Sequence, residues 1–194
     1  MARMSFSKTR NRLRIIGGEW RSRVVVFADA PDLRPTPDRV RETLFNWLQP
    51  RLVGAQCLDL FAGSGVLGFE ALSRGAAAVT ALELDPHAVA AIRDNIKTLQ
   101  TDKLRLVPQN ALDWLRTNAQ EQRFDVVFLD PPFAENLYGE CCRLLAEQRW
   151  LAPGALLYLE SGAKLDELQL PEGWKLIRHK RAGAVHYGLV QASL

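Results

Sequence analysis

Residues 128–133 read FLDPPF and place a carboxylate, two prolines and an aromatic ring after an apolar run. Since proline cannot donate to a sheet ladder, the run predicts a buried strand that ends at Asp130. An exocyclic amine on a nucleobase is a poor nucleophile because its lone pair is delocalised into the ring. The Asp130 carboxylate and the Pro131 carbonyl can accept the two amine hydrogens and free that pair. Pro132 restricts the preceding backbone and Phe133 can stack on the base, although the tetrapeptide alone also fits an ordinary turn.

A second candidate site lies in residues 58–68, which read LDLFAGSGVLG. Gly63, Gly65 and Gly68 match the GxGxxG pattern between a predicted strand and a predicted helix, where the backbone can approach a ligand closely. Glu83 ends the next predicted strand, 20 residues after Gly63, and can accept hydrogen bonds from ribose hydroxyls. The pattern favours an adenosine-containing cofactor, although a tight strand–helix turn gives the same spacing.

The acid at Asp59 separates two classes of cofactor. A carboxylate beside this loop would repel the pyrophosphate of a nicotinamide dinucleotide. The ammonium and sulfonium groups of S-adenosylmethionine are cationic and suit a carboxylate there. A methyl transfer to an amine is also the reaction that the DPPF residues suit, so the two motifs favour a methyltransferase over an oxidoreductase.

The overall composition fits one globular domain. The chain has 194 residues, 47% of them hydrophobic, and no apolar run of the roughly 20 residues that a membrane helix needs. The N-terminus lacks the apolar stretch of a secretory signal. Cys57, Cys141 and Cys142 have no CxxC spacing, which indicates reduced thiols in a cytoplasmic protein and no metal site.

Charge is spread unevenly along the chain. Residues 1–28 carry seven basic side chains and one acid, a net charge of +6, which leaves −3 for the rest of a chain whose total is +3. A basic arm on a mildly acidic body indicates a polyanionic partner such as nucleic acid, although a solvated tail has the same composition. The candidate RNA-binding residues are Arg10, Arg12, Arg14, Arg21, Arg23, Arg34 and Arg39.

The N-terminal region predicts a β-hairpin followed by a helix. Residues 13–27 read as two strands joined by a two-residue turn at Gly17 and Gly18. Thr36 is expected to cap a helix that has Pro37 at its first position, and Pro50 and Gly54 are expected to end it.

Several other side chains carry expectations. Trp20 is expected to pack the hairpin onto the domain. The arginines of residues 34–42, Arg41 among them, are expected either to coat the helix surface or, for Arg34 or Arg39, to reach the site or an RNA phosphate. Tyr138 lies just after DPPF and fits either the base pocket or a helix surface.

From residue 55 onward, strands and helices alternate. The first four strands are short and apolar, as in a parallel sheet covered on both faces. The last two follow each other without a helix, so the sheet is expected to end in an antiparallel hairpin. Strands are expected at 56–60, 79–82, 104–107, 124–129, 155–160, 174–180 and 184–191, and helices at 66–74, 86–99, 111–120 and 135–148.

Several long segments resemble a known family. LDLFAGSGVLGFEALSRGA, ALELD and FLDPPF, together with the N-terminal RIIGGEWR and RPTPDRVRETLFNWL, resemble the RsmD family of bacterial 16S rRNA guanine-N2 methyltransferases over nearly the whole chain. The resemblance implies an α/β, class I S-adenosylmethionine-dependent methyltransferase fold, with a mostly parallel seven-stranded sheet and an N-terminal β-hairpin extension. It implies an RNA-binding extension over residues 1–50 and a Rossmann-like domain over 51–194. It also implies that the partner is 16S rRNA in the small ribosomal subunit or its assembly intermediate. A monomer is the default expectation for an rRNA enzyme of this size.

The resemblance also implies roles for individual residues. Asp59, Gly63 and Gly65 would surround the methionine part of the cofactor, Glu83 would take the ribose, and residues 130–133 would hold the target base. The family usually has Asp-Ala after the third strand of this domain, where this chain has Asn110-Ala111, and an asparagine carbonyl can still accept from the adenine amine. The full set of expected cofactor contacts is Asp59, Phe61, Ala62, Gly63, Ser64, Gly65, Glu83, Leu84, Asn110 and Ala111.

Other functions stay open at this point. Methyltransferases of adenine N6 in DNA, or of a protein amide, are alternatives, but by family resemblance they usually carry asparagine or serine at the position of Asp130. A nicotinamide oxidoreductase would explain the glycine pattern but neither Asp59 nor DPPF. A non-catalytic RNA-binding or assembly factor on the same scaffold is disfavoured by the intact DPPF.

Overall fold

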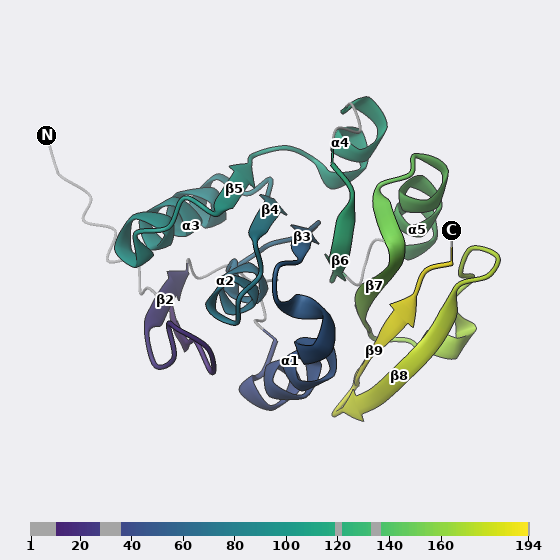
Figure 1. Cartoon of the computed structure of the whole chain (residues 1–194), viewed down its shortest axis with the longest axis horizontal. Helices are drawn as coiled ribbons and strands as arrows, with labels where there is room; N and C mark the ends of the chain where they lie inside the picture. The colour runs from purple at the N-terminus through teal and green to yellow at the C-terminus, as the bar shows by residue number, and fades with distance from the viewer. Residues whose placement is uncertain (1–10, 28–35, 119–121, 133–136, 194) are drawn as a thin grey trace, which may run out of the picture.

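The centre of the molecule is a seven-stranded sheet with the strand order β5-β4-β3-β6-β7-β9-β8 (Figure 1). The computed structural model describes residues 11–27, 36–118, 122–132 and 137–193. The first five strands in this order pair in parallel, and β9 runs antiparallel to both β7 and β8. The expected parallel sheet with an antiparallel C-terminal hairpin is therefore confirmed. The strands are β3 (Gln56–Asp59), β4 (Ala78–Leu82), β5 (Leu104–Val107), β6 (Phe124–Leu129), β7 (Leu151–Ser161), β8 (Lys175–Ala182) and β9 (Val185–Gln191).

Helices cover both faces of the sheet, which gives a three-layer fold (Figure 1). Side chains alternate along β6, so Phe128 joins the core under Phe45 and Phe69, whereas Val127 joins the core on the other face with Trp114. The first core is covered by α1, α2 and α3, and the second by α4, α5 and η1. The helices are α1 (Asp38–Leu52), α2 (Val66–Ser73), α3 (Pro86–Leu99), α4 (Ala111–Thr117), α5 (Tyr138–Glu147) and the short 3₁₀ helix η1 (Leu165–Glu167).

Helix α1 differs from its expectation at both ends. The cap position is Pro37, and no side chain caps the helix. The hydroxyl of Thr36 instead donates to Glu160 Oε2 at 3.2 Å, so the expected threonine cap is wrong. The helix also continues through Pro50 to Leu52, because a proline in the last turn removes only one late hydrogen bond.

The N-terminal strands β1 (Asn11–Arg14) and β2 (Val24–Phe27) form the expected antiparallel pair, but the expected two-residue turn is wrong. Residues 15–23 connect the two strands. Gly17 N donates to the Glu70 carboxylate on α2 at 2.8 Å, and a Cβ added at Gly18 would lie 1.8 Å from the Ser73 carbonyl oxygen. The glycines therefore serve a close backbone approach to α2.

A buried ion cluster joins this hairpin to the rest of the molecule. Arg41 has 0% exposure, so the expectation that it coats a helix surface is wrong. Its guanidinium donates to the carbonyls of Arg14 at 3.0 Å and Thr36 at 3.2 Å, and lies 3.6 Å from the buried carboxylate of Glu70. The division of the chain at residue 50 stays a prediction, and these contacts join the two sides of it.

The remaining expectations concern burial and membrane helices. Trp20 is partly buried and packs against the core of the α1–α3 face, as expected. Cys57, Cys141 and Cys142 are buried and free, in agreement with reduced thiols. In the described part of the chain, no helix is long and apolar enough to cross a membrane.

Candidate active site

The loop between β3 and α2 owes its shape to two glycines with positive φ. Gly63 has a φ of 52° and Gly65 a φ of 74°, and Gly65 occupies the N-cap of α2. A Cβ on Gly65 would lie 3.0 Å from the Phe69 ring and 3.1 Å from Ile92. At Gly68 the added atom would lie 3.1 Å from a Val79 methyl group, which shows how tightly α2 packs on β4. The glycine pattern therefore reflects both backbone conformation and close packing.

Asp59 is the last residue of β3 and its side chain is buried, with 3% exposure. Among the described residues, no donor reaches its Oδ2 atom. Burial raises the pKa of Asp59 to about 7, the Glu83 carboxylate adds to this, and a hydrogen bond from the Phe61 backbone partly opposes it. A buried carboxylate oxygen without a donor indicates a place for a cationic or donor group of a ligand.

Glu83 follows β4 and holds the glycine loop in place. Its Oε2 accepts from Gly63 N at 2.6 Å, and its Oε1 accepts from Leu84 N and Asp85 N at 2.8 Å each. Each carboxylate oxygen has two lone pairs, so Oε2 retains the capacity for one more donor. The Leu84 side chain beside it is 64% exposed and offers an apolar surface next to that carboxylate.

Asp130 follows the end of β6, on the strand next to Asp59. In the parallel register Asp59 lies opposite Phe128, two residues before Asp130. The pKa of Asp130 is raised well above its ordinary value, first by burial and then by the Glu160 and Asp59 carboxylates. Pro131 is buried and Pro132 is exposed, whereas Phe133 lies outside the described residues.

Glu160, near the end of β7, was not expected at the site from sequence. It is 5% exposed, and its Oε2 accepts from the Tyr158 hydroxyl at 2.7 Å as well as from Thr36. Tyr138 is buried and donates its hydroxyl to the Glu160 carbonyl, so it does not lie on a helix surface. Burial raises the pKa of Tyr138, and the Asp130 carboxylate adds to this.

Four parallel strands therefore each deliver one carboxylate at the carboxyl end of the sheet, where ligands bind in open α/β folds. A simple rule, an acid at the end of each buried strand, would have identified Glu160 with the other three. Among the described side chains, none of the four forms an ion pair. The cluster favours a ligand that carries positive charge or several donors. Its members are Asp59, Glu83, Asp130 and Glu160, referred to below as the four carboxylates.

The expected RNA-binding arginines of the hairpin lie away from the four carboxylates, whereas Arg39 lies in the first turn of α1, three residues after Thr36, whose hydroxyl donates to Glu160. The loop 15–23 contacts the C-terminal half of α2, where Trp20 N donates to the Ser73 hydroxyl at 2.9 Å, whereas the carboxylates lie at the other end of that helix. Arg23 donates to the Thr98 carbonyl at 2.6 Å. Arg12, Arg14, Arg21, Arg23 and Arg39 are exposed, and Arg10 and Arg34 lie outside the described residues.

A hollow of about 400 Å³ lies between the loop 15–23 and the C-terminal end of α3. Trp20, Arg23, Gln100 and Lys103 are among its lining residues. The hollow is lined by both acidic and basic residues and is remote from the four carboxylates. The candidate active site is therefore identified by its carboxylates and not by this hollow. In the described part of the chain, no group of three or more metal-ligating side chains has the geometry to hold a metal ion.

Comparison with known proteins decides the family. Residues 13–191 match the family model described as Conserved hypothetical protein 95. Ribosomal RNA small subunit methyltransferase D of Haemophilus influenzae is 45% identical over 98% of this chain and 100% of its own length, and its Escherichia coli counterpart is 48% identical over 93% and 90%. The chain belongs to this family.

The solved structures agree with the fold. An Escherichia coli protein named "Putative methyltransferase" superposes with a TM-score of 0.84 at 47% identity, covering 94% of this chain and 99% of that one. A Haemophilus influenzae protein titled "putative methylase" has a TM-score of 0.79 at 45% identity, covering 95% of this chain and 100% of that one. The class I methyltransferase fold expected from the sequence is thereby confirmed.

One residue that departs from the pattern expected of the methyltransferase D family is Asn110. It is the N-cap of α4, and its Oδ1 accepts from Leu112 N at 2.9 Å and Asp113 N at 3.2 Å. Both lone pairs of that oxygen are therefore engaged, and the remaining polar group of the side chain is an NH₂ donor. In this structure the asparagine caps a helix rather than presenting a carbonyl to solvent.

Proposed function

We propose that this protein transfers a methyl group from S-adenosylmethionine to the exocyclic N2 amine of a guanine in 16S rRNA. The observation that carries the proposal is the buried Oδ2 of Asp59, which lies among four carboxylates and has no hydrogen-bond donor among the described residues. A ligand with an ammonium and a sulfonium group would offset this negative charge, whereas a pyrophosphate would add to it. Homologues named ribosomal RNA small subunit methyltransferase D support the choice of rRNA.

The cofactor contacts follow from the geometry of the loop. Asp59 would accept from the ammonium of the methionine part, and the backbone of Gly63 and Gly65 would allow close approach. Glu83 would accept from a ribose hydroxyl with the lone pair that its three backbone donors leave free. Leu84 would pack against the ribose and adenine, which explains an exposed apolar side chain at this position.

The target amine would be held at the end of β6. Asp130 and the Pro131 carbonyl would each accept one hydrogen of the guanine amine and orient its lone pair toward the methyl group. S-adenosylmethionine would supply an electrophilic methyl: the N–C bond forms as the C–S bond breaks, and the bonding electrons remain on sulfur as a neutral thioether. The methylated nitrogen then loses a proton, and Asp130, whose pKa is raised by burial, would accept it.

Adenine would lie next to Asn110 and Ala111. Since Oδ1 of Asn110 already accepts two backbone hydrogen bonds, its NH₂ group would donate to a ring nitrogen of adenine rather than accept from the amine. This replaces the expectation from sequence that the asparagine carbonyl accepts, and it predicts weaker cofactor binding than an aspartate would give.

The finer features of the proposal concern the substrate state and the cell. The substrate would be an assembled or partly assembled small-subunit particle, and the enzyme would act as a cytoplasmic monomer. The target base would need to be unpaired or flipped to reach Asp130. Arg10, Arg34 and Phe133, outside the described residues, keep their proposed roles in RNA contact and base stacking.

The deciding experiment is transfer of labelled methyl from S-adenosylmethionine to small-subunit particles from cells that lack the gene. Naked rRNA and wild-type particles serve as parallel substrates. We expect label in the first substrate alone or most strongly, mapped to N2 of one guanine and lost with Asp130→Ala. Tight binding of S-adenosylhomocysteine without labelling of any RNA would overturn the substrate while leaving the cofactor assignment in place.

A further inference from the structure

Edge strand β8 carries a run of basic residues that no assigned role explains. Residues 178–181 read RHKR, and all four are exposed. In the described part of the chain, no carboxylate pairs with Arg178, Lys180 or Arg181 within 4 Å. The two guanidinium groups donate to carbonyls of their own hairpin, those of Ile177 at 3.0 Å and Gly183 at 2.7 Å.

Some other exposed cations in the described part of the chain have acidic partners. Arg116 pairs with Glu140, Arg143 pairs with Glu147 at 2.5 Å, and Lys164 lies 3.7 Å from Glu167. Isolated lysines often protect an edge strand from pairing with other chains. Such protection does not require three cations within four residues at one particular end of the strand.

The strand register places this run beside the candidate active site. Glu160 lies opposite Tyr187, and Tyr187 lies opposite Lys180 on the next strand. Neighbouring strands are about 4.8 Å apart, so the Lys180 backbone is roughly 10 Å from that of Glu160. The basic end of β8 and the four carboxylates thus share the same end of the sheet.

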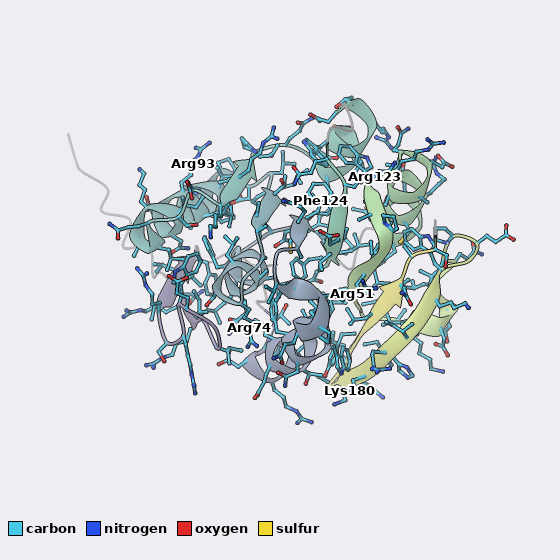
Figure 2. The ribbon with its side chains drawn as sticks, in the orientation of Figure 1. Arg51, Arg74, Arg93, Arg123, Phe124 and Lys180 are labelled. Carbon is cyan, nitrogen blue, oxygen red and sulfur yellow. The ribbon has the colours of Figure 1, made fainter. Side chains whose placement is uncertain are left out.

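The lysine at the centre of the run is held by its neighbours. Lys180 Nζ lies 5.9 Å from the centre of the Trp47 ring, and Trp47 stacks on Tyr187 with ring centres 5.7 Å apart. Figure 2 shows Lys180 at the end of β8 next to α1. A cation fixed over an aromatic ring loses less conformational freedom on binding a phosphate than a freely extended lysine does.

The negative charge of the four carboxylates and the positive charge of the β8 run have complementary effects on an RNA substrate. Four carboxylates that suit a cationic cofactor would repel the phosphates of an incoming RNA strand. Cations beside them would offset that repulsion and hold the backbone while the base enters. We propose that the run Arg178–Arg181 binds the phosphodiester backbone of the rRNA next to the target guanine, which rests on the proposed function.

The test compares three variants that each alter three cations. The first, Arg178→Gln/Lys180→Gln/Arg181→Gln, removes the charges. The second, Arg178→Lys/Lys180→Arg/Arg181→Lys, keeps them. The matched control, Arg93→Gln/Lys97→Gln/Arg105→Gln, removes three exposed charges from α3 and the opposite edge strand β5, and Figure 2 shows Arg93 at the other side of the molecule.

Methyl transfer to small-subunit particles is measured from 50 to 300 mM KCl, together with the affinity for S-adenosylhomocysteine. For the first variant we expect KM for the particle to rise about tenfold or more, and the slope of log(kcat/KM) against log[salt] to fall in magnitude by about 2 to 3. The affinity for S-adenosylhomocysteine should stay within twofold of wild type. The charge-keeping variant and the matched control should resemble wild type in KM.

Two negative results have different meanings. If the first variant has the KM and salt slope of the matched control, the β8 surface does not bind RNA, although the proposed function stands. If wild-type enzyme neither binds nor methylates any rRNA substrate, the proposed function fails and this inference fails with it. An equal loss in the charge-keeping variant would show that the effect comes from folding of the hairpin and would also overturn the inference.

Discussion

Two buried carboxylates of this protein, Glu70 and Asp59, differ in how many partners they have. Glu70 accepts from the backbone of Ile16 and Gly17 and from Arg74 Nε, all at 2.8 Å, and Arg41 lies beside it. Asp59 is almost as deeply buried, yet its Oδ2 has no donor among the described residues. Buried polar groups are normally satisfied. The difference indicates that the satisfied acid stabilises the fold, and it is the basis for our proposal that the unsatisfied acid binds a ligand.

The largest expected effect on stability comes from the satisfied cluster. Glu70→Gln would remove the buried acid that pairs with Arg41 and Arg74 and leave Arg41 only the exposed carboxylate of Asp38 as a counter-charge, so the free energy of unfolding should fall by about 3 to 5 kcal/mol. Urea unfolding at pH 7.5 measures this. Glu140→Gln, which removes an exposed partner of Arg116 and Arg143, is the matched control and should cost no more than about 1 kcal/mol. If the two variants lost the same amount of stability, the buried Glu70 would contribute no more to folding than an exposed ion pair does.

The next effect concerns the four carboxylates of the candidate active site, where loss of one acid should lower the reaction rate rather than destabilise the fold. Asp130→Ala should lower kcat by about 10²- to 10³-fold, because one of two acceptors for the amine is lost. The affinity for S-adenosylhomocysteine should change less than fivefold. Asp130→Asn, which retains a carbonyl acceptor but no base, should lie between wild type and Asp130→Ala. Asp166→Ala, an exposed acid on η1, should leave kcat unchanged, and a similar loss there would discredit the assignment.

Asp59→Asn sharpens the comparison because it should stabilise the fold and weaken the site. Burial raises the pKa of Asp59 from 3.8 to about 7, so the ionised form costs stability in the ligand-free protein. This cost is absent below pH 4, grows as pH rises toward 7 and is complete above it. At pH 8 the variant should be more stable than wild type by about 2 kcal/mol or more, and at pH 3.5 the two should be equal.

The same residue gives a pH dependence of binding. The wild-type affinity for S-adenosylhomocysteine should weaken about tenfold for each pH unit below 7, because the ammonium requires an ionised Asp59. Isothermal titration calorimetry in buffers of different ionisation enthalpy should detect proton release on binding at pH 6.5. The Asn variant should bind at least tenfold more weakly and release no proton from this position. A variant with undiminished affinity would remove Asp59 from the cofactor site.

The smallest expected effect is a gain. Asn110→Asp would keep one oxygen as the cap of α4 and offer the second to the adenine amine, so S-adenosylhomocysteine should bind about three- to tenfold tighter, as expected for one added hydrogen bond. Isothermal titration calorimetry at pH 8 measures this. Asn46→Asp, an exposed change of the same type on α1, controls for the added charge. Unchanged affinity in Asn110→Asp would place adenine elsewhere.

Local sequence patterns predicted the central fold well. The predicted segments at 86–99, 104–107 and 124–129 coincide with α3, β5 and β6. Each combines a clear hydrophobic period with strong end signals, such as Asp85 capping α3 through hydrogen bonds from His87 N and Ala88 N. Information of this kind is contained in a few consecutive residues.

The predictions that failed depended on contacts between distant segments. The local sequence at Gly17 and Gly18 predicts a turn, but their conformation is set by contacts with α2, more than 50 residues away. Thr36 reads as a cap, yet its hydroxyl bonds to Glu160 across 124 positions. The local sequence predicts that Arg41 lies on the surface, because Glu70, the buried acid that pairs with it, is distant in the sequence. The roles proposed for the site residues stay predictions, although the structure brings the acids among them together.

The sulfur chemistry of the molecule gives it a practical advantage for spectroscopy. Burial raises the pKa of all three thiols, Cys57, Cys141 and Cys142, to about 12. Thiolates are the form that reacts with maleimides, so the native chain should resist such labelling while it stays folded. A single cysteine introduced at exposed Val53 would therefore carry a fluorophore at a unique position, and the arrival of the enzyme on ribosomal particles could be followed without first removing any natural cysteine.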